Sequence, residues 1–158
     1  MAYEMQSLRF SCTRCNSCCS GSPGFVWLSI GDLDALCRRT GLSRREFAEA
    51  YCRVVDLGAL TTLSLREKEN FDCIFLKKTG CCVYDARPAQ CRTYPFWESI
   101  IESRRSWEAE GQYCPGIGKG VPVPSESILD AILERRANPP LSLKEIPELS
   151  DMIPGLHA

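Results

Sequence analysis

Apolar residues recur at helical spacing in two clear segments of the chain. The strongest pattern covers residues 125–138, where four aliphatic side chains share one face: Ile128, Leu129, Ile132 and Leu133. Residues 43–55 predict a second helix, because Ser43 and Glu46 form a capping box ahead of an apolar stripe. A shorter helix is expected over residues 31–41.

Shorter apolar runs predict strands over residues 25–30, 60–65 and 71–76. Proline sets the limits of one further short helix, which is expected to begin at Pro88 and to end before Pro95. Proline suits the first position of a helix, where no hydrogen bond is lost, and it stops a helix at later positions.

The rest of the chain predicts irregular or ambiguous structure. Residues 10–24 and 115–124 combine glycine and proline with other loop-forming residues and predict loops. Residues 96–110 fit either a strand or a helix, and we favour a helix near Trp107. The tail from Pro139 contains three further prolines and is expected to wrap the surface.

Size and charge narrow the class of protein. The 158 residues suit one domain, and the net charge of −1 provides no global field for nucleic acid or an anionic membrane. Apolar runs such as Phe25 to Leu28 fall far short of the ~20 residues that span a bilayer. The N-terminus lacks the basic and apolar regions of a signal peptide. We therefore expect a cytoplasmic protein without nucleic-acid or membrane partners.

Cysteine is the most unusual component of the sequence. The chain has 11 cysteines, an odd number, and cytosolic cysteine clusters are more often metal sites or catalytic thiols than disulfides. Cys37 and Cys52 share helical faces with apolar neighbours and are interpreted as core residues. Cys82 adjoins Cys81, and we favour Cys81 as the one that faces a metal. Eight cysteines lie in loop-like or strand-end contexts: Cys12, Cys15, Cys18, Cys19, Cys73, Cys81, Cys91 and Cys114.

The spacing of Cys12, Cys15 and Cys18 doubles the Cys-x-x-Cys turn, which brings sulfur atoms to one side of the backbone. Three cysteines at this spacing are typical of ferredoxin-type sequences, whose fourth ligand is a distant Cys followed by Pro. Cys114 precedes a proline and is a candidate for that ligand. The pattern favours an iron–sulfur cluster and leaves zinc open, because thiolates suit both. His157, the single histidine, is expected to be exposed rather than a ligand.

Two roles without a metal compete for the same cysteines. A thioredoxin-type redox pair needs only two cysteines at a strand-to-helix junction, so it leaves most of them without a role. Unrelated structural thiols would account for the number of cysteines but not for the double Cys-x-x-Cys spacing. A metal site accounts for both the number and the spacing.

Three stretches of the sequence resemble the YkgJ-like cysteine-cluster family of zinc- or iron-chelating domains: FSCTRCNSCC, CIFLKKTGCCVYDARPAQCRTYPF and CPGIGKG. The resemblance covers residues 8–120, and it implies that the eight cysteines named above form the cluster. It places Cys82 at a variable position, and Asn16 stands where relatives often carry glycine. The larger flagellin lysine N-methylases share the cysteine motif, although no methyl-donor site is recognisable in this chain.

Eight thiolates exceed the four that one tetrahedral metal ion takes. We expect one cluster held by Cys12, Cys15, Cys18 and a remote cysteine, and a second site formed by the rest. The adjacent Cys18 and Cys19 are expected to point in different directions and to serve different centres.

Two arginines close to Cys91 in the sequence allow two interpretations. Arg87 and Arg92 could cap a helix and pair with a carboxylate such as Asp85. They could equally balance the charge of thiolate sulfurs, which tunes a metal cluster.

The sequence as a whole predicts an α+β fold, a small single domain (residues 1–158) of short strands and several helices around a cysteine–metal cluster. The cluster motif spans residues 8–120, followed by a helix and a proline-rich tail over residues 125–158. Its expected function is metal binding by an all-cysteine site, with metal ions and a protein as partners. Two alternatives are a metal-dependent enzyme related to the flagellin lysine N-methylases and a structural zinc domain that presents an interaction surface.

Overall fold

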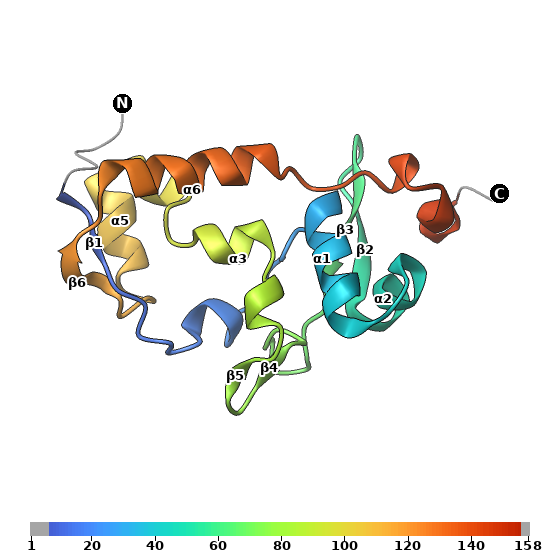
Figure 1. Ribbon diagram of the computed structural model, residues 1–158, viewed down its shortest axis with the longest axis horizontal. Coiled ribbons are helices and arrows are strands. Elements are labelled where there is room, and N and C mark those ends of the chain that lie inside the picture. The colour runs from blue at the N-terminus through green and yellow to red at the C-terminus, as the bar shows by residue number, and fades with distance from the viewer. Residues whose placement is uncertain (1–6, 156–158) are drawn as a thin grey trace.

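Two separate sets of buried apolar side chains organise the chain, one toward each end of an elongated molecule (Figure 1). The structure is a computed structural model and describes residues 7–155. The first set, which we call the hairpin core, lies among α1 (Ile30–Thr40), α2 (Arg44–Tyr51) and the antiparallel hairpin of β2 (Cys52–Asp56) and β3 (Thr61–Leu65). Phe47, Leu28 and Leu63 are among its fully buried members.

The second set, which we call the helical core, lies among α4 (Glu98–Ile101), α5 (Arg104–Glu110) and α6 (Ser125–Ala137). Trp107 and Ile128 are among its buried side chains. A small antiparallel sheet of β1 (Arg9–Phe10) and β6 (Ile117–Pro122) completes it.

Short elements fill the space between the two cores (Figure 1). They are α3 (Ala89–Thr93) and the hairpin of β4 (Leu76–Lys77) and β5 (Gly80–Cys81), which projects from the body. The cysteine-rich loop after β1 crosses this region before the chain enters α1. The fold is therefore α+β, as the sequence predicts, while the extent of the domain stays a prediction.

Local capping signals place the first two helices well. Ser29 and Asp32 form a reciprocal capping box at the start of α1, which ends at Gly41 with a φ of 74°. Ser43 and Glu46 form the predicted box at the start of α2. Each box satisfies backbone N–H groups that have no partner within the helix.

Several sequence predictions are wrong because long-range pairing decides the outcome. The helix predicted over residues 43–55 ends at Tyr51, since the next residues pair along β3 instead. The run at 25–30 forms only an isolated bridge between Trp27 and Ser64 rather than a strand, and Ile30 already belongs to α1.

Two further predictions are also wrong, one of a strand and one of a loop. The strand predicted at 71–76 is mostly a turn, in which the Leu76 N–H donates to the Cys73 carbonyl oxygen, and β4 begins only at Leu76. The loop predicted at 115–124 contains β6, a bulged strand whose Gly118 and Gly120 have positive φ angles. Glycine adopts this backbone region without steric cost, which explains its loop-like sequence.

The C-terminal segment is more buried than its sequence suggests. Five apolar side chains after residue 140 belong to the hairpin core rather than to a surface wrap: Leu141, Leu143, Ile146, Leu149 and Ile153. On α6, Ile128 is buried and Ile132 packs beside it, but Leu129 and Leu133 are 47% and 51% exposed, so the predicted four-residue face is only half buried. Within residues 7–155, no helix is long and apolar enough to cross a membrane.

Gly116 lies where two chain segments cross closely. The Ser11 N–H donates to the Gly116 carbonyl oxygen over 3.0 Å, and a Cβ atom on Gly116 would lie 2.5 Å from the Ser11 carbonyl oxygen. We expect Gly116→Ala to lower the free energy of unfolding by about 1–3 kcal/mol, because the added methyl group overpacks the crossing. Urea denaturation measures this change.

The control is Gly24→Ala, since a Cβ atom on Gly24 meets nothing within 4 Å and its φ is not positive. Equal stability of the two variants would contradict the assignment of Gly116 as a close crossing.

Candidate metal centre

Cysteines from separate parts of the chain line one cavity of about 340 Å³, which we call the cysteine cavity. Seven of the eight predicted ligands lie in its wall: Cys12, Cys15, Cys18, Cys19, Cys73, Cys81 and Cys91. All seven are free thiols. The fold thus gathers most of the predicted site at one place.

The loop that carries the first four cysteines contains two residues with left-handed backbone. Arg14 has a φ of 54° and Asn16 a φ of 63°, so each Cys-x-x-Cys turn contains one such residue. Asparagine adopts this region more readily than most residues and glycine more readily still. The positive φ at position 16 therefore suits the asparagine that the sequence has there.

The second group of cysteines lies on the projecting hairpin and the turn before it. The Cys73 N–H donates to the Cys19 carbonyl oxygen over 2.7 Å and ties this turn to the first loop. Cys81 lies on β5 and lines the cysteine cavity. Cys82 is exposed and outside the cavity lining, and its carbonyl oxygen accepts a hydrogen bond from Arg39. Cys81 thus lies in the cavity wall and Cys82 does not, while the choice of Cys81 as a ligand stays a prediction.

A buried glutamine holds α3, and with it Cys91, against the preceding chain. The Gln90 Oε1 accepts from the Trp27 N–H over 3.0 Å, and its Nε2 donates to the Phe25 carbonyl oxygen over 2.8 Å. The Trp97 indole N–H donates to the Gln90 carbonyl oxygen. Gln90 thus satisfies both backbone groups of an extended segment, as a neighbouring strand would. Sequence reasoning missed this role, although Gln90 lies inside the RPAQC stretch of the motif.

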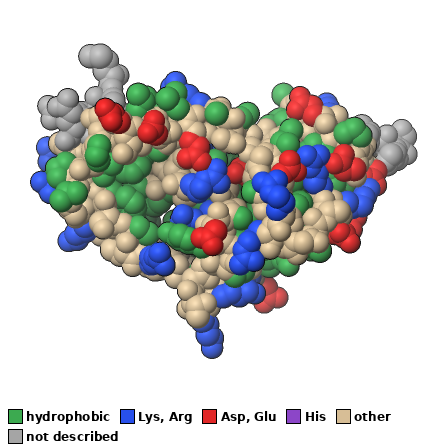
Figure 2. Space-filling view, in the orientation of Figure 1, with side chains coloured by type: hydrophobic (Ala, Val, Ile, Leu, Met, Phe, Trp, Pro, Cys, Tyr) green, Lys and Arg blue, Asp and Glu red, His purple; other side chains and the backbone are tan. Residues whose placement is uncertain are grey.

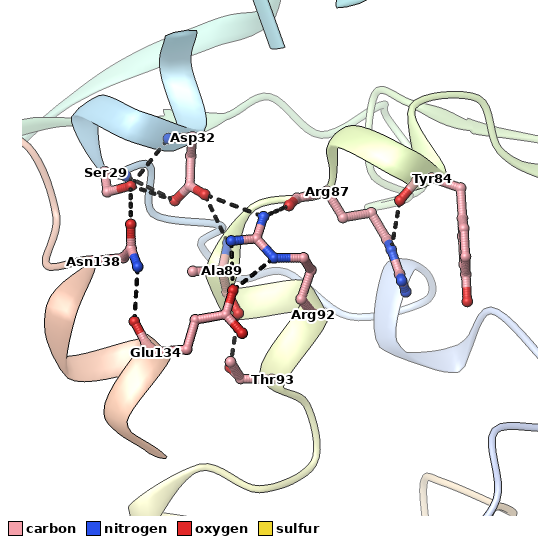
Figure 3. Close-up of polar contacts among 9 residues, drawn as sticks. All are labelled: Ser29, Asp32, Tyr84, Arg87, Ala89, Arg92, Thr93, Glu134 and Asn138. Carbon is pink, nitrogen blue, oxygen red and sulfur yellow. Dashed lines mark hydrogen bonds and ion pairs between the residues drawn. The ribbon is translucent and has the colours of Figure 1, made fainter. Parts of the chain in front are cut away.

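A polar network connects α3 to α1 and α6 (Figure 3). Asp32, which is 3% exposed, accepts hydrogen bonds from the Ser29 and Ala89 N–H groups. Arg92 reaches Asp32 over 3.6 Å and Glu134 over 2.7 Å. A buried carboxylate is tolerated when hydrogen bonds and an opposite charge satisfy it. Arg92 therefore pairs with distant carboxylates, and the predicted pairing with Asp85 is not found among the ion pairs of the described residues.

Cys114, the eighth predicted ligand, is not in the wall of the cysteine cavity. It is buried beside Tyr94, which does line the cavity and whose hydroxyl donates to Glu110 over 2.6 Å. Burial, together with Glu110, raises the pKa of Tyr94, so the phenol stays protonated. The structure brings Cys114 to the edge of the site without exposing its thiol to the cavity.

The remaining cysteines agree with their interpretation as core residues. Cys37 is 8% exposed and Cys52 is 1% exposed, and both belong to the hairpin core. Cys52 reaches this place from β2 rather than from a helix. Burial raises the pKa of Cys52 to about 12. The expectation for His157 lies outside the described residues.

The thiols of the cysteine cavity influence one another. Burial raises the pKa of Cys91 to about 12, with a further rise from the neighbouring Cys73, Cys18 and Cys81. Burial also raises the pKa values of Cys73 and Cys81. Without a metal these thiols keep their protons, because burial disfavours their charged forms and neighbouring thiolates would repel each other.

Cys18 and Cys19 lie side by side rather than pointing in different directions. Their sulfur atoms are 3.7 Å apart, and the hydrogen bond between them lowers the pKa of Cys18 and raises that of Cys19. The expectation of divergent side chains is therefore wrong for this structure. The assignment of the two residues to different centres stays a prediction.

The cysteines of the cavity are the kind of ligand that a soft metal prefers, but their sulfur atoms are not arranged around one metal position. No group of three His, Cys, Asp or Glu side chains within residues 7–155 is placed so that it could hold a metal ion as it stands. Cysteine thiols nevertheless line the cysteine cavity without histidine or carboxylate, and thiolate ligands select zinc, copper(I) or iron–sulfur clusters. Binding would have to draw the sulfur atoms together.

A second cavity of about 280 Å³ shares part of this wall. Both cavities are lined by Cys18, Cys19, Cys73 and Cys91. The rest of the second cavity is rich in aromatic side chains: Phe25, Phe71, Tyr94, Trp97 and Tyr113. These four cysteines thus lie in the walls of both cavities.

Comparison with known families identifies the cysteine pattern. The profile of the CxxCxxCC family, described as "Putative zinc- or iron-chelating domain", matches residues 11–115, more than half of the chain. The chain belongs to this family. The match confirms the resemblance that the motifs carry, and it begins just before Cys12 and ends just after Cys114. No solved structure gives a significant match.

Substitutions should separate the cavity cysteines from the others. Cys18→Ala and Cys91→Ser are expected to lower the metal content and the melting temperature of the purified protein, because each removes a thiol from the cavity wall. Cys37→Ser and Cys82→Ser are expected to change the metal content little. Elemental analysis and thermal unfolding measure the two effects.

Cys82→Ser is the matched control for the loss of one thiol. Cys82 follows Cys81 directly in the sequence, but it does not line the cavity. Equal metal loss in the Cys82 and Cys91 variants would refute this division of the thiols.

Proposed function

We propose that the protein binds iron or zinc through thiolates of the cysteine cavity, and we favour an iron–sulfur cluster. The observation that supports this most strongly is the convergence of seven cysteines from separate segments on one cavity. The double Cys-x-x-Cys spacing of Cys12, Cys15 and Cys18 favours iron–sulfur chemistry. Membership of a family of zinc- or iron-chelating domains supports the same class of metal.

The number of thiols supports more than one metal ion or a polynuclear cluster. Seven thiols lie in the cavity wall and Cys114 lies next to Tyr94, whereas one tetrahedral ion takes four ligands. Cys12, Cys15 and Cys18 are proposed to share one centre with a remote cysteine. Cys114 is the candidate for that ligand, because it lies next to Tyr94, which lines the cavity.

Metal binding in this cavity would stabilise the fold and release protons. The ligands come from segments up to 102 positions apart, Cys12 to Cys114, so the metal would cross-link distant parts of the chain. The thiols of Cys73, Cys81 and Cys91 have raised pKa values and must lose protons to bind. The apparent affinity for metal therefore decreases as the pH falls.

Electron transfer or sensing is the role we propose for such a centre, and two alternatives follow from other observations. The aromatic second cavity shares four cysteines with the site and would suit a metal-dependent enzyme that admits a substrate there. A zinc centre without a reactive position would suit a structural domain that presents a surface to a protein partner.

The nature of the metal is tested by spectroscopy and elemental analysis together. Protein prepared without air is expected to absorb visible light and to contain iron and acid-labile sulfide, because thiolate-bound iron–sulfur clusters are coloured. The Cys18→Ala variant prepared in the same way should lose most of the visible absorption.

A colourless anaerobic protein with stoichiometric zinc would overturn the iron–sulfur assignment but keep the metal site. Protein that contains neither metal under these conditions, and takes up neither on reconstitution, would overturn the proposed function itself.

A further inference from the structure

The cysteine cavity carries positive charge that no carboxylate in its wall balances. Arg14, Arg87 and Arg92 line it, and no Asp or Glu does so among residues 7–155. Thr79 and Gly80, at the turn of the projecting hairpin, also belong to the wall. Figure 2 shows basic side chains at the tip of this projection, where the sequence places Lys77 and Lys78. These lysines add to the positive potential near the cavity.

Arg92 is already paired, but Arg14 and Arg87 are not. Arg92 binds Glu134 and lies near Asp32, so its charge is compensated. Neither Arg14 nor Arg87 forms an ion pair with any carboxylate of the described residues. Two guanidinium groups without an ion pair in the wall of one cavity can bind an anion through bidentate hydrogen bonds.

Tyr84 holds both guanidinium groups in place. The Arg87 Cζ lies 3.5 Å from the centroid of the Tyr84 ring, and the Arg14 Cζ lies 5.0 Å from it. The Arg87 Nε donates to the Tyr84 carbonyl oxygen over 2.8 Å (Figure 3). This hydrogen bond uses Nε and leaves the two terminal nitrogens of Arg87 without a hydrogen bond to the described chain.

Compensation of thiolate charge explains only part of this arrangement. Arg87 opposes the rise in pKa that burial causes at Cys81 and Cys91, so it lies close to the thiols. Arg14 is exposed, and the contact that the structure shows for its guanidinium is with Tyr84. The pair is thus placed to bind a group that enters from solvent.

We propose that Arg14 and Arg87 bind the carboxylate of a small organic acid at the mouth of the cysteine cavity. The planar guanidinium fork matches the two oxygen atoms of a carboxylate. Phe10 and Phe75, also in the cavity wall, provide an apolar surface for the organic part of the ligand. The proposal rests on the proposed function only in placing this ligand next to a metal centre.

Calorimetric titration of the full-length, metal-loaded protein with benzoate, benzamide and inorganic phosphate tests the proposal. Benzoate is expected to bind more tightly than phosphate, and the uncharged benzamide is expected not to bind. Arg14→Gln and Arg87→Gln should each weaken benzoate binding on the order of tenfold, the usual effect of losing a charge-assisted hydrogen bond. Arg105→Gln is the matched control, because Arg105 is exposed on α5 and lines neither cavity.

Metal content measured on the same samples separates the two proposals. If the wild-type protein contains no metal, that result contradicts the proposed metal site only. The benzoate titration then still tests the proposed carboxylate site. Absence of benzoate binding, unchanged affinity in both arginine variants, or tighter binding of phosphate would overturn the carboxylate assignment. If Arg87→Gln loses metal, Arg14→Gln still provides the test, because Arg14 is exposed and forms no ion pair within residues 7–155.

Discussion

The positions of the cysteines depend on one constraint, which is that each segment that carries them is anchored in one of two separate hydrophobic cores. The first cysteine loop leaves Phe10 in the helical core and returns to the hairpin core at Val26. Cys73 and Cys81 pack against the hairpin core, whereas Tyr94 packs in the helical core. The cysteine cavity is therefore enclosed by segments whose ends are fixed on opposite sides of it.

Polar contacts, rather than a continuous apolar core, connect the two ends of the molecule. Gln90 binds the backbone of the segment before α1, and Asp32 and Glu134 hold Arg92 between α1 and α6. Such contacts stabilise less than apolar burial because they replace hydrogen bonds to water. A metal bound to thiolates from several of these segments would add a strong cross-link between the two hydrophobic cores. Metal binding and folding would then be coupled.

The features that could be predicted from the sequence are those that depend on residues close together in the chain. The capping box of Ser43 and Glu46 and the prolines around α3 place helices correctly, and the burial of Cys37 follows from its helical face. The sequence could not predict the pairing of β6 with β1 or the burial of the tail, because both depend on partners more than 70 residues away. At the site, local context selected eight cysteines, of which seven share a cavity, but the partners that position them, above all Gln90, are recognisable only in three dimensions.

The central claim is that a metal holds the cysteines of the cavity, and a map of thiol alkylation before and after metal removal tests it most directly. In the metal-loaded native protein, mass spectrometry should find Cys82 modified and the seven cavity cysteines and Cys114 protected. After chelation the exposed Cys12, Cys15 and Cys18 should become reactive, while Cys37 and Cys52 stay buried and unmodified. Cavity cysteines that react equally with and without metal would contradict the account.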